Sequence, residues 1–222
     1  MAISVLIDKQ DSFEIVRDKI AQILVAETVL QKAKAVLANK NSSLWALNVY
    51  IERSDAIEQY SSQSFDITPI VNVSYESGEF PQSKGDTGEQ QTHEATFNID
   101  CYGAGMSEDT QSGQLCADEQ AAKNAQRALR LVRNIIMSSE YRYLGLRGTV
   151  GRRWPLSIKS LAPADMEASI RIVVMRLQLR VSFIENSPQY TPVTLLETNV
   201  NFKRQENGQI VMAADYIYDV EN

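Results

Sequence analysis

One long alternating segment, residues 168–184, constrains the fold more than any other part of the chain. One side of it is apolar throughout, with Val173, Met175, Leu177, Leu179, Val181 and Phe183 at every second position. The other side begins with Ile170, Ile172 and Val174 and turns polar from Arg176 onward. Strict alternation predicts a β-strand. The change on its second side predicts that the strand starts with both faces covered and ends with one face exposed.

Other periodic segments supply the rest of a sheet and two helices. Strands are predicted over residues 45–51, 67–75 and 93–102, where side chains alternate between apolar and polar. Apolar residues at helical spacing predict amphipathic helices over residues 12–38 and 118–139. The first helix opens on Asp11 with Glu14 three residues later, the sequence of a capping box. The elements together predict an α+β fold, a mainly antiparallel sheet flanked by two helices on one face.

The segments between these elements are rich in glycine, charge or turn residues. Residues 78–91 hold three glycines and one proline and predict a polar loop, and Gly103-Ala104-Gly105 predicts a turn that opens the next loop. Residues 141–154 form a basic stretch to which no strand is assigned, and Asn207-Gly208 predicts the turn of a β-hairpin. The predicted organisation is an α+β domain over residues 1–186 and a C-terminal extension with the β-hairpin over residues 187–222.

Charge is distributed unevenly along the chain. The net charge of −6 hides an acidic block over residues 76–119, where ten acids face the single base Lys84, a net −9. Residues 120–182 hold twelve Lys and Arg against three acids, a net +9. Either the two blocks form solvated faces that pair within the fold, or the acidic face of one subunit meets the basic face of an identical neighbour.

The chain lacks the residue patterns of the common enzyme and metal sites. His93 is the only histidine, and a lone histidine is more often structural than catalytic. Cys101 and Cys116 lie fifteen residues apart without a CxxC motif, and no Gly-Lys dipeptide of a P-loop occurs. We therefore expect no catalytic, cofactor-binding or metal-binding residues. No apolar run approaches the ~20 residues that span a bilayer, so we expect a soluble protein without a membrane partner.

In the order of its elements the chain resembles the tail-terminator (tail-completion) proteins of long-tailed bacteriophages. The resemblance covers residues 12–186 and is carried by the opening helix, the strand pair 67–75 and 93–102 (ITPIVNVSY, EATFNIDCYG), the helix 118–139 and the strand 168–183. It implies a ring, usually hexameric, that caps the tail tube, ends its elongation and docks the head. The implied partners are further copies of the chain, the tail tube protein and neck or connector proteins, with the sheath as a further candidate. The implied location is the tail or neck of the virion, assembled in the host cytoplasm.

Two candidate sites follow from this resemblance together with the charge blocks. We expect an acidic loop to face the channel, where like charge repels DNA that passes through, and its candidate residues are Glu76, Glu79, Asp86 and Glu89. We expect a basic face to form the contact between subunits, and its candidate residues are Arg127, Arg130, Arg133, Arg152 and Arg153.

Three other functions stay open at this point. The first is a head–tail stopper, connector or baseplate protein of the same kind of virion. The second is a nucleic-acid-binding module that uses the arginines of residues 127–153 with Tyr141, Tyr143 and Trp154 interleaved. The third is an enzyme of unrecognised type.

Overall fold

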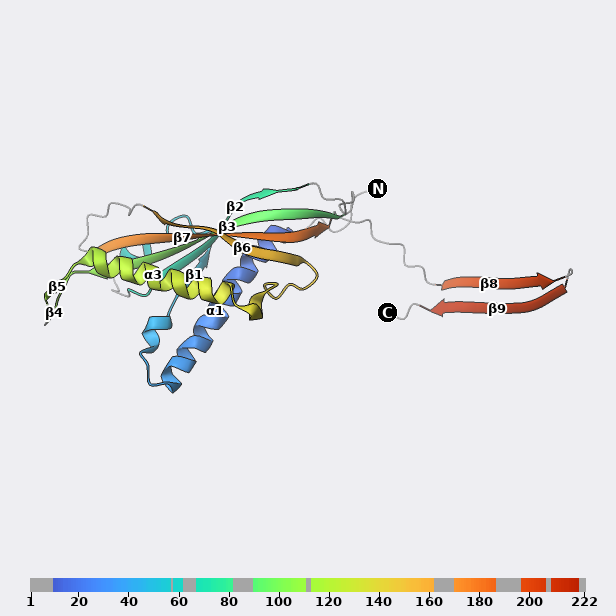
Figure 1. Ribbon diagram of the computed structural model, residues 1–222, viewed down its shortest axis with the longest axis horizontal. Coiled ribbons are helices and arrows are strands. Elements are labelled where there is room, and N and C mark those ends of the chain that lie inside the picture. The colour runs from blue at the N-terminus through green and yellow to red at the C-terminus, as the bar shows by residue number, and fades with distance from the viewer. Residues whose placement is uncertain are drawn as a thin grey trace. The chain divides into compact units, whose positions relative to one another are not determined.

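The computed structural model shown in Figure 1 describes residues 10–56, 58–61, 67–81, 90–110, 113–161, 170–186, 197–206 and 209–219. The chain divides into two compact units, one of residues Asp8–Ser187 and one of Met1–Ile7 with Pro188–Asn222.

The larger unit is built on a five-stranded sheet. Its strands, in spatial order, are β1 (Asn48–Ile51), β2 (Ile70–Glu79), β3 (Gln90–Met106), β7 (Ile170–Asn186) and β6 (Val150–Leu161). Only β1 and β2 run parallel, and every other neighbouring pair is antiparallel. The predicted α+β fold with a mainly antiparallel sheet is therefore confirmed.

Two long helices, α1 (Ser12–Leu37) and α3 (Ala117–Ile136), cover one face of this sheet (Figure 1). The predicted capping box at the start of α1 is present, since Asp11 and Glu14 each bond the other's backbone N–H. Residues of both helices share one core with the odd-numbered positions of β3 and β7, among them Phe97, Ile99, Leu177, Leu179 and Phe183. Burial of these apolar side chains supplies most of the driving force for folding.

The predicted turn at Gly103-Ala104-Gly105 is wrong, because β3 continues through it to Met106. Both glycines lie under α3. A Cβ at Gly103 would come within 2.2 Å of the Ala125 nitrogen, and one at Gly105 within 2.2 Å of the Ala117 oxygen. Asn124 of α3, which is buried, donates a 2.8 Å hydrogen bond to the Ala104 oxygen. The glycines thus allow α3 to approach the strand at backbone distance.

Strand β6 was not predicted, since residues 141–154 carry only a basic pattern. It is an edge strand, and most of its residues are exposed, so it shows no regular alternation of burial. Its register with β7 also shifts twice, next to Gly151 and next to Leu156. A strand that is solvated on its outer edge and interrupted by bulges carries little periodic signal.

The opposite face of the sheet has a small second core at one end. Ala56, Tyr60, Ile70, Ala104, Ile172 and Val174 pack there. The Tyr60 hydroxyl lies 3.1 Å from the carbonyl oxygens of Thr68 and Tyr102 and accepts a hydrogen bond from the Ile70 nitrogen. β7 therefore begins with both faces covered, and from Arg176 onward one face carries polar side chains that are only partly buried, as predicted.

Shorter elements complete the described chain. These are the 3₁₀ helices η1 (Ser42–Trp45) and η2 (Ser139–Tyr141), the helix α2 (Glu58–Ser61) and the strand pair β4 (Glu108–Thr110) and β5 (Gly113–Leu115). The predicted strand over residues 45–51 is thus a 3₁₀ turn followed by the short β1. The predicted loop over residues 78–91 begins in β2 and ends in β3, and its residues 82–89 lie outside the described part.

The smaller unit contains the predicted hairpin. β8 (Glu197–Glu206) pairs antiparallel with β9 (Gln209–Asp219), with Val200 opposite Tyr216 and Asn199 opposite Ile217. The predicted turn residues Asn207 and Gly208 lie outside the described residues.

Candidate functional site

The two charge blocks pair with each other on the open face of the sheet. Asp100 on β3 stands opposite Arg176 on β7, and the guanidinium donates two hydrogen bonds to the carboxylate, 2.7 Å from Nε and 2.8 Å from Nη2. The hydrogen bonds to Asp100 raise the pKa of Arg176. Arg180 lies 3.8 Å from a carboxylate oxygen of Glu79 and 3.7 Å from one of Glu94. For these strand residues the pairing is within the fold, the first of the two interpretations.

The four candidate channel residues do not form one described loop. Glu76 and Glu79 lie in strand β2, where Glu76 accepts a 2.8 Å hydrogen bond from Gln178 and Glu79 pairs with Arg180. The expectation that these two acids lie in a loop is therefore wrong. Asp86 and Glu89 lie outside the described residues. A channel-facing role for the four acids stays a prediction.

Arg153 of the candidate basic face has a structural role. Its guanidinium donates hydrogen bonds to the carbonyl oxygens of Ile136 at 2.7 Å, Ser138 at 2.6 Å and Arg142 at 2.7 Å. These carbonyls lie at the C-terminus of α3 and just after it, where backbone acceptors have no helical partner and a positive charge is favourable. Burial and the neighbouring Arg142 lower the pKa of Arg153. Arg152, in contrast, is exposed and lies over the Trp154 ring.

The other three arginines lie on the solvent side of α3. Arg127, Arg130 and Arg133 make no ion pair with another described residue. Partial burial, and the like charge of Arg130, lower the pKa of Arg127. Arg127 and Arg130 thus place positive charge on a face of α3 where no described carboxylate pairs with them.

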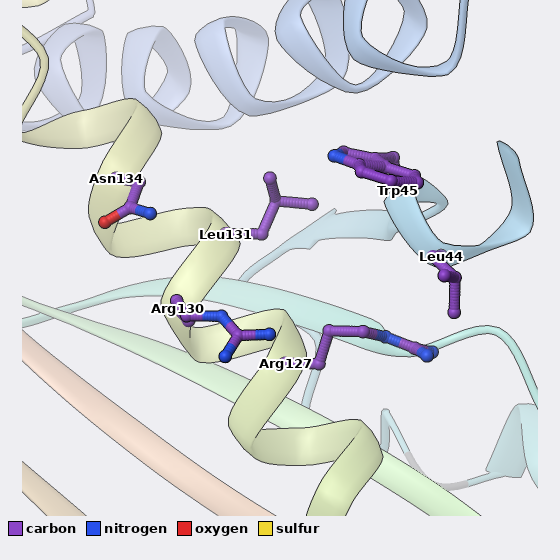
Figure 2. A pocket seen from close by; sticks show the side chains of 6 residues that line it. All are labelled: Leu44, Trp45, Arg127, Arg130, Leu131 and Asn134. Carbon is purple, nitrogen blue, oxygen red and sulfur yellow. The ribbon is translucent and has the colours of Figure 1, made fainter. Parts of the chain in front are cut away.

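Arg127 and Arg130 border a pocket between α3 and η1, shown in Figure 2. The pocket measures about 290 Å³. We call it the arginine pocket, and its lining residues are Leu44, Trp45, Arg127, Arg130, Leu131 and Asn134. In the view, Trp45 of η1 faces Leu131 of α3, and Arg127 extends toward η1. An apolar floor bordered by two unpaired guanidinium groups suits an anionic ligand or segment with an apolar anchor.

A second hollow of about 660 Å³ adjoins the arginine pocket through the shared residues Trp45, Leu131 and Asn134. It lies between α1 and α3. The Tyr141 hydroxyl there donates a 2.6 Å hydrogen bond to Glu27. This contact raises the pKa of Tyr141 to about 12 and lowers the pKa of Glu27. Tyr141 thereby ties α1 to the segment that follows α3.

The C-terminal half of α1 exposes apolar side chains and extends away from the sheet (Figure 1). Val29 is 63% exposed, Val36 61% and Leu37 85%, and Val25 is also exposed. We call Val25, Val29 and Val36 the outer stripe, because Leu37 directly follows Val36 and lies on another side of the helix. It lies opposite the buried side of the helix, to which Val16, Ile20 and Leu24 belong. Leu30 and Leu37 were predicted to share the buried stripe, and that part of the prediction is wrong. Contiguous exposed apolar residues mark protein–protein contact sites.

The sequence carried a signal for this outer stripe that its interpretation missed. Val25, Val29 and Val36 are spaced by four and seven residues, which places them on one side of a helix. A second apolar side on a helix indicates a second surface that packs or makes contacts.

His93, the fourth residue of β3, is buried. Its Nδ1 lies 2.8 Å from a carboxylate oxygen of Glu185, and its ring stacks on Phe80 with centroids 4.3 Å apart. Cys101 is buried in the core, and burial raises the pKa of its thiol. Among the residues that the structure describes, no group of three His, Cys, Asp or Glu side chains could hold a metal ion.

No helix within the described ranges combines the length and the apolar character needed to cross a membrane. Neither the protein-family models nor the curated proteins give a match to this chain, so the function is inferred from the chain's own residues and surfaces.

Proposed function

We propose that this chain is a structural subunit of a ring that caps the tail tube of a long-tailed bacteriophage, ends tail elongation and provides the surface on which the head docks. The observations that carry the proposal are two features of the helices. The outer stripe of α1 is apolar and exposed, and three arginines of α3 make no ion pair with a described carboxylate. A surface of this kind suits permanent contacts with other protein subunits.

A cap on a tube requires contacts between identical subunits that close on themselves. Head-to-tail contacts between two different patches close into a ring when the rotation per subunit permits. The chain offers such a patch in the basic and apolar arginine pocket, whereas the overall charge of −6 leaves acidic surface elsewhere. The same negative charge would let DNA pass a central channel without binding to its wall.

The nucleic-acid-binding alternative is disfavoured because several basic residues already make contacts within the fold. Arg153 is occupied by three backbone carbonyls, and Arg176 and Arg180 are paired with carboxylates. Lys123 and Arg171 are likewise paired, with Glu119 and Asp118. The arginines on the solvent side of α3 remain for an external anion, together with the exposed Arg142, Arg147, Arg152 and Lys159.

The proposal is tested by electron microscopy of virus particles that lack this protein. Overlong tails without heads are expected, because nothing stops tube growth. Complete tails of normal length beside full heads would instead show a head–tail stopper, and normal particles would contradict both functions. In a second measurement the purified protein is added to free tail tubes. It should bind one end of each tube and prevent further addition of tube protein.

A further inference from the structure

The arginine pocket and the hollow that adjoins it form one groove along α3, with charge of opposite sign at its two ends. We call it the helix groove. Arg127 and Arg130 border its first end and make no ion pair with a described carboxylate. Its second end is lined by Glu27, Lys34 and Glu140, which together leave one negative charge. The groove is therefore basic at one end and acidic at the other.

Between these ends the helix groove is apolar. Leu30 of α1 is 51% exposed and Leu44 of η1 is 41% exposed, and Trp45 and Leu131 line both hollows. Figure 2 shows the part of the groove between α3 and η1. An apolar groove of this kind receives one side of an amphipathic helix, whose anchoring side chains are spaced by three, four or seven residues.

The outer stripe of α1 has this spacing. Val25, Val29 and Val36 follow one another at four and seven residues, and all three are exposed. Lys32 lies on the same side of the helix, is exposed and makes no ion pair with a described residue. The C-terminal half of α1 extends away from the sheet, so a second molecule can reach the stripe (Figure 1).

The stripe also has charge of opposite sign at its two ends. Asp18 lies two turns before Val25 on the same side of α1. Asp18 and Glu52 share the guanidinium of Arg17, so the three groups together leave one negative charge. Lys32 supplies the positive charge toward the other end. The stripe therefore matches the helix groove when its Asp18 end lies toward the arginines and its Lys32 end toward Glu140.

The lengths of the two surfaces agree as well. From Asp18 to Lys32 the stripe spans about 21 Å along α1, at 1.5 Å per helical residue. From Arg127 to its end at Ile136, α3 spans about 14 Å, and Glu140 lies beyond that end. Both pairs of opposite charges can therefore meet in one contact.

The stripe and the groove face opposite ways on the same helix. Glu27 and Lys34, which line the groove, lie about half a turn around α1 from Val25 and Val36. Because α1 is itself a wall of the groove, a chain cannot place the stripe in its own groove. Two chains that exchanged stripes would each need both surfaces on one side. The contact is therefore head-to-tail.

We propose that the helix groove of one subunit receives the outer stripe of α1 from a second copy of this chain. The inference rests on the proposed function in one respect, since this contact would be the head-to-tail contact that closes the ring. Every subunit supplies one groove and one stripe. The contact can therefore repeat from copy to copy without a second protein.

Aspartate substitutions on each side of the contact test the proposal. V29D/V36D places two charges in the outer stripe and leaves the groove intact. L30D/L44D places two charges in the groove and leaves the stripe intact. Each variant alone should self-associate about a hundredfold more weakly than the unmodified protein, because two carboxylates would lie in an apolar contact.

An equimolar mixture of the two variants should form a dimer and nothing larger. The intact stripe of L30D/L44D enters the intact groove of V29D/V36D, and the remaining stripe and groove of the pair are both defective. L156D/I158D is the matched control and should assemble normally, since it makes the same change at exposed residues of β6. Assembly is measured by sedimentation velocity and by retention on isolated tail tubes, and circular dichroism establishes that each variant is folded.

The other outcomes overturn the contact. If L30D/L44D assembles normally, the stripe binds another surface, such as the stripe of a second copy. If V29D/V36D assembles normally, the groove receives another segment or another protein. A mixture that stays monomeric while the unmodified protein assembles would refute the pairing of stripe with groove. An unmodified protein that stays monomeric both in solution and on tail tubes would refute it too.

Charge exchange tests the direction in which the stripe lies in the groove. K32E and E140K should each weaken self-association about fivefold, as for a partly exposed ion pair. The single chain K32E/E140K should recover it, because every acidic stripe end then meets a basic groove end. Without recovery, the proposed direction is wrong.

These outcomes separate the inference from the proposed function. V29D/V36D and L30D/L44D proteins that still form rings and cap tubes would leave the capping function intact and refute the contact. A mixed dimer from a protein that never binds tail tubes would support the contact and refute the capping function.

Discussion

The two long helices cover the same sheet face but differ in what they leave on the outside. α3 buries alanine, leucine, valine and isoleucine on one side and presents arginine, lysine and asparagine on the other. α1 buries Val16, Ile20 and Leu24 and also exposes the outer stripe. The outward side of α3 is polar, as on a helix in contact with solvent, whereas the outward side of α1 is apolar, as on a helix that contacts a partner. The difference separates residues that stabilise the fold from residues that we propose join subunits.

A substitution at the contact between α3 and β3 should lower the free energy of unfolding more than the other changes predicted below. In the variant G103A the new Cβ would meet the backbone of α3 at 2.2 Å, and the helix must move away from β3. We expect the free energy of unfolding, measured by urea denaturation, to fall by more than about 3 kcal/mol. Gly151 is the control, since a Cβ there has its nearest neighbour at 3.7 Å. Equal effects of G103A and G151A would refute the close approach of α3.

The two sides of α1 should respond to truncation in opposite ways. Leu24 is fully buried, so L24A should lower the free energy of unfolding by about 2–3 kcal/mol. V29S and V36S change exposed positions and should alter it by less than about 0.5 kcal/mol. The same two substitutions should weaken association with other subunits, measured by light scattering or retention on tail tubes. Unchanged association would show that the outer stripe is not a contact surface.

The stability of the C-terminus of α3 should depend on the planar guanidinium group of Arg153, which binds three carbonyl oxygens at once. R153M leaves three carbonyl oxygens without their charged donor, and we expect a loss of about 1.5 kcal/mol in the free energy of unfolding. R153K should recover only part of this, because an ammonium group cannot reach three separated carbonyls as a planar guanidinium does. R152M is the control at the neighbouring exposed position. If R153K recovered the whole free energy of unfolding, Arg153 would stabilise the protein through its charge alone.

Much of the sheet and both helices could be predicted from sequence, because burial imposes a period on the residues. The changing second face of β7 is the clearest case, since Ile172 lies in the second core and Arg176 on the open face. Features that depend on a partner far away in the chain could not be predicted. The pattern at Gly103 predicts a turn, because the sequence does not show the helix that lies above it. The charge of Arg153 predicts an exposed residue, because the sequence does not show the carbonyl oxygens that accept its hydrogen bonds.

The candidate site was predicted less completely than the fold. Arg127, Arg130 and Arg133 are exposed or partly exposed and make no ion pair with a described residue, and the basic face as an interface stays a prediction. The apolar half of the site was missed. Leu30 and Leu37 share the helical spacing of the buried residues, and spacing alone does not tell where α1 extends past the sheet.

The contact between Tyr141 and Glu27 joins α1 to the end of α3 and should produce a small, pH-dependent stabilisation. Because the folded state lowers the pKa of Glu27, this contribution is present above the usual carboxyl pKa and is lost as the pH falls through the lowered value. Because the folded state raises the pKa of Tyr141 from 10.0 to about 12, the contribution is also lost as the pH rises between these values.

Y141F should therefore lower the free energy of unfolding by about 0.5 kcal/mol at neutral pH, since solvent screens a contact that is only partly buried. The difference between Y141F and the unmodified protein should shrink below the carboxyl range and above pH 10.0. Urea denaturation at pH 3, 7 and about 11 measures it, and Y143F serves as the control. A difference that stays constant across this range would show that the hydroxyl contributes packing alone, and that α1 and α3 are joined only through their shared core.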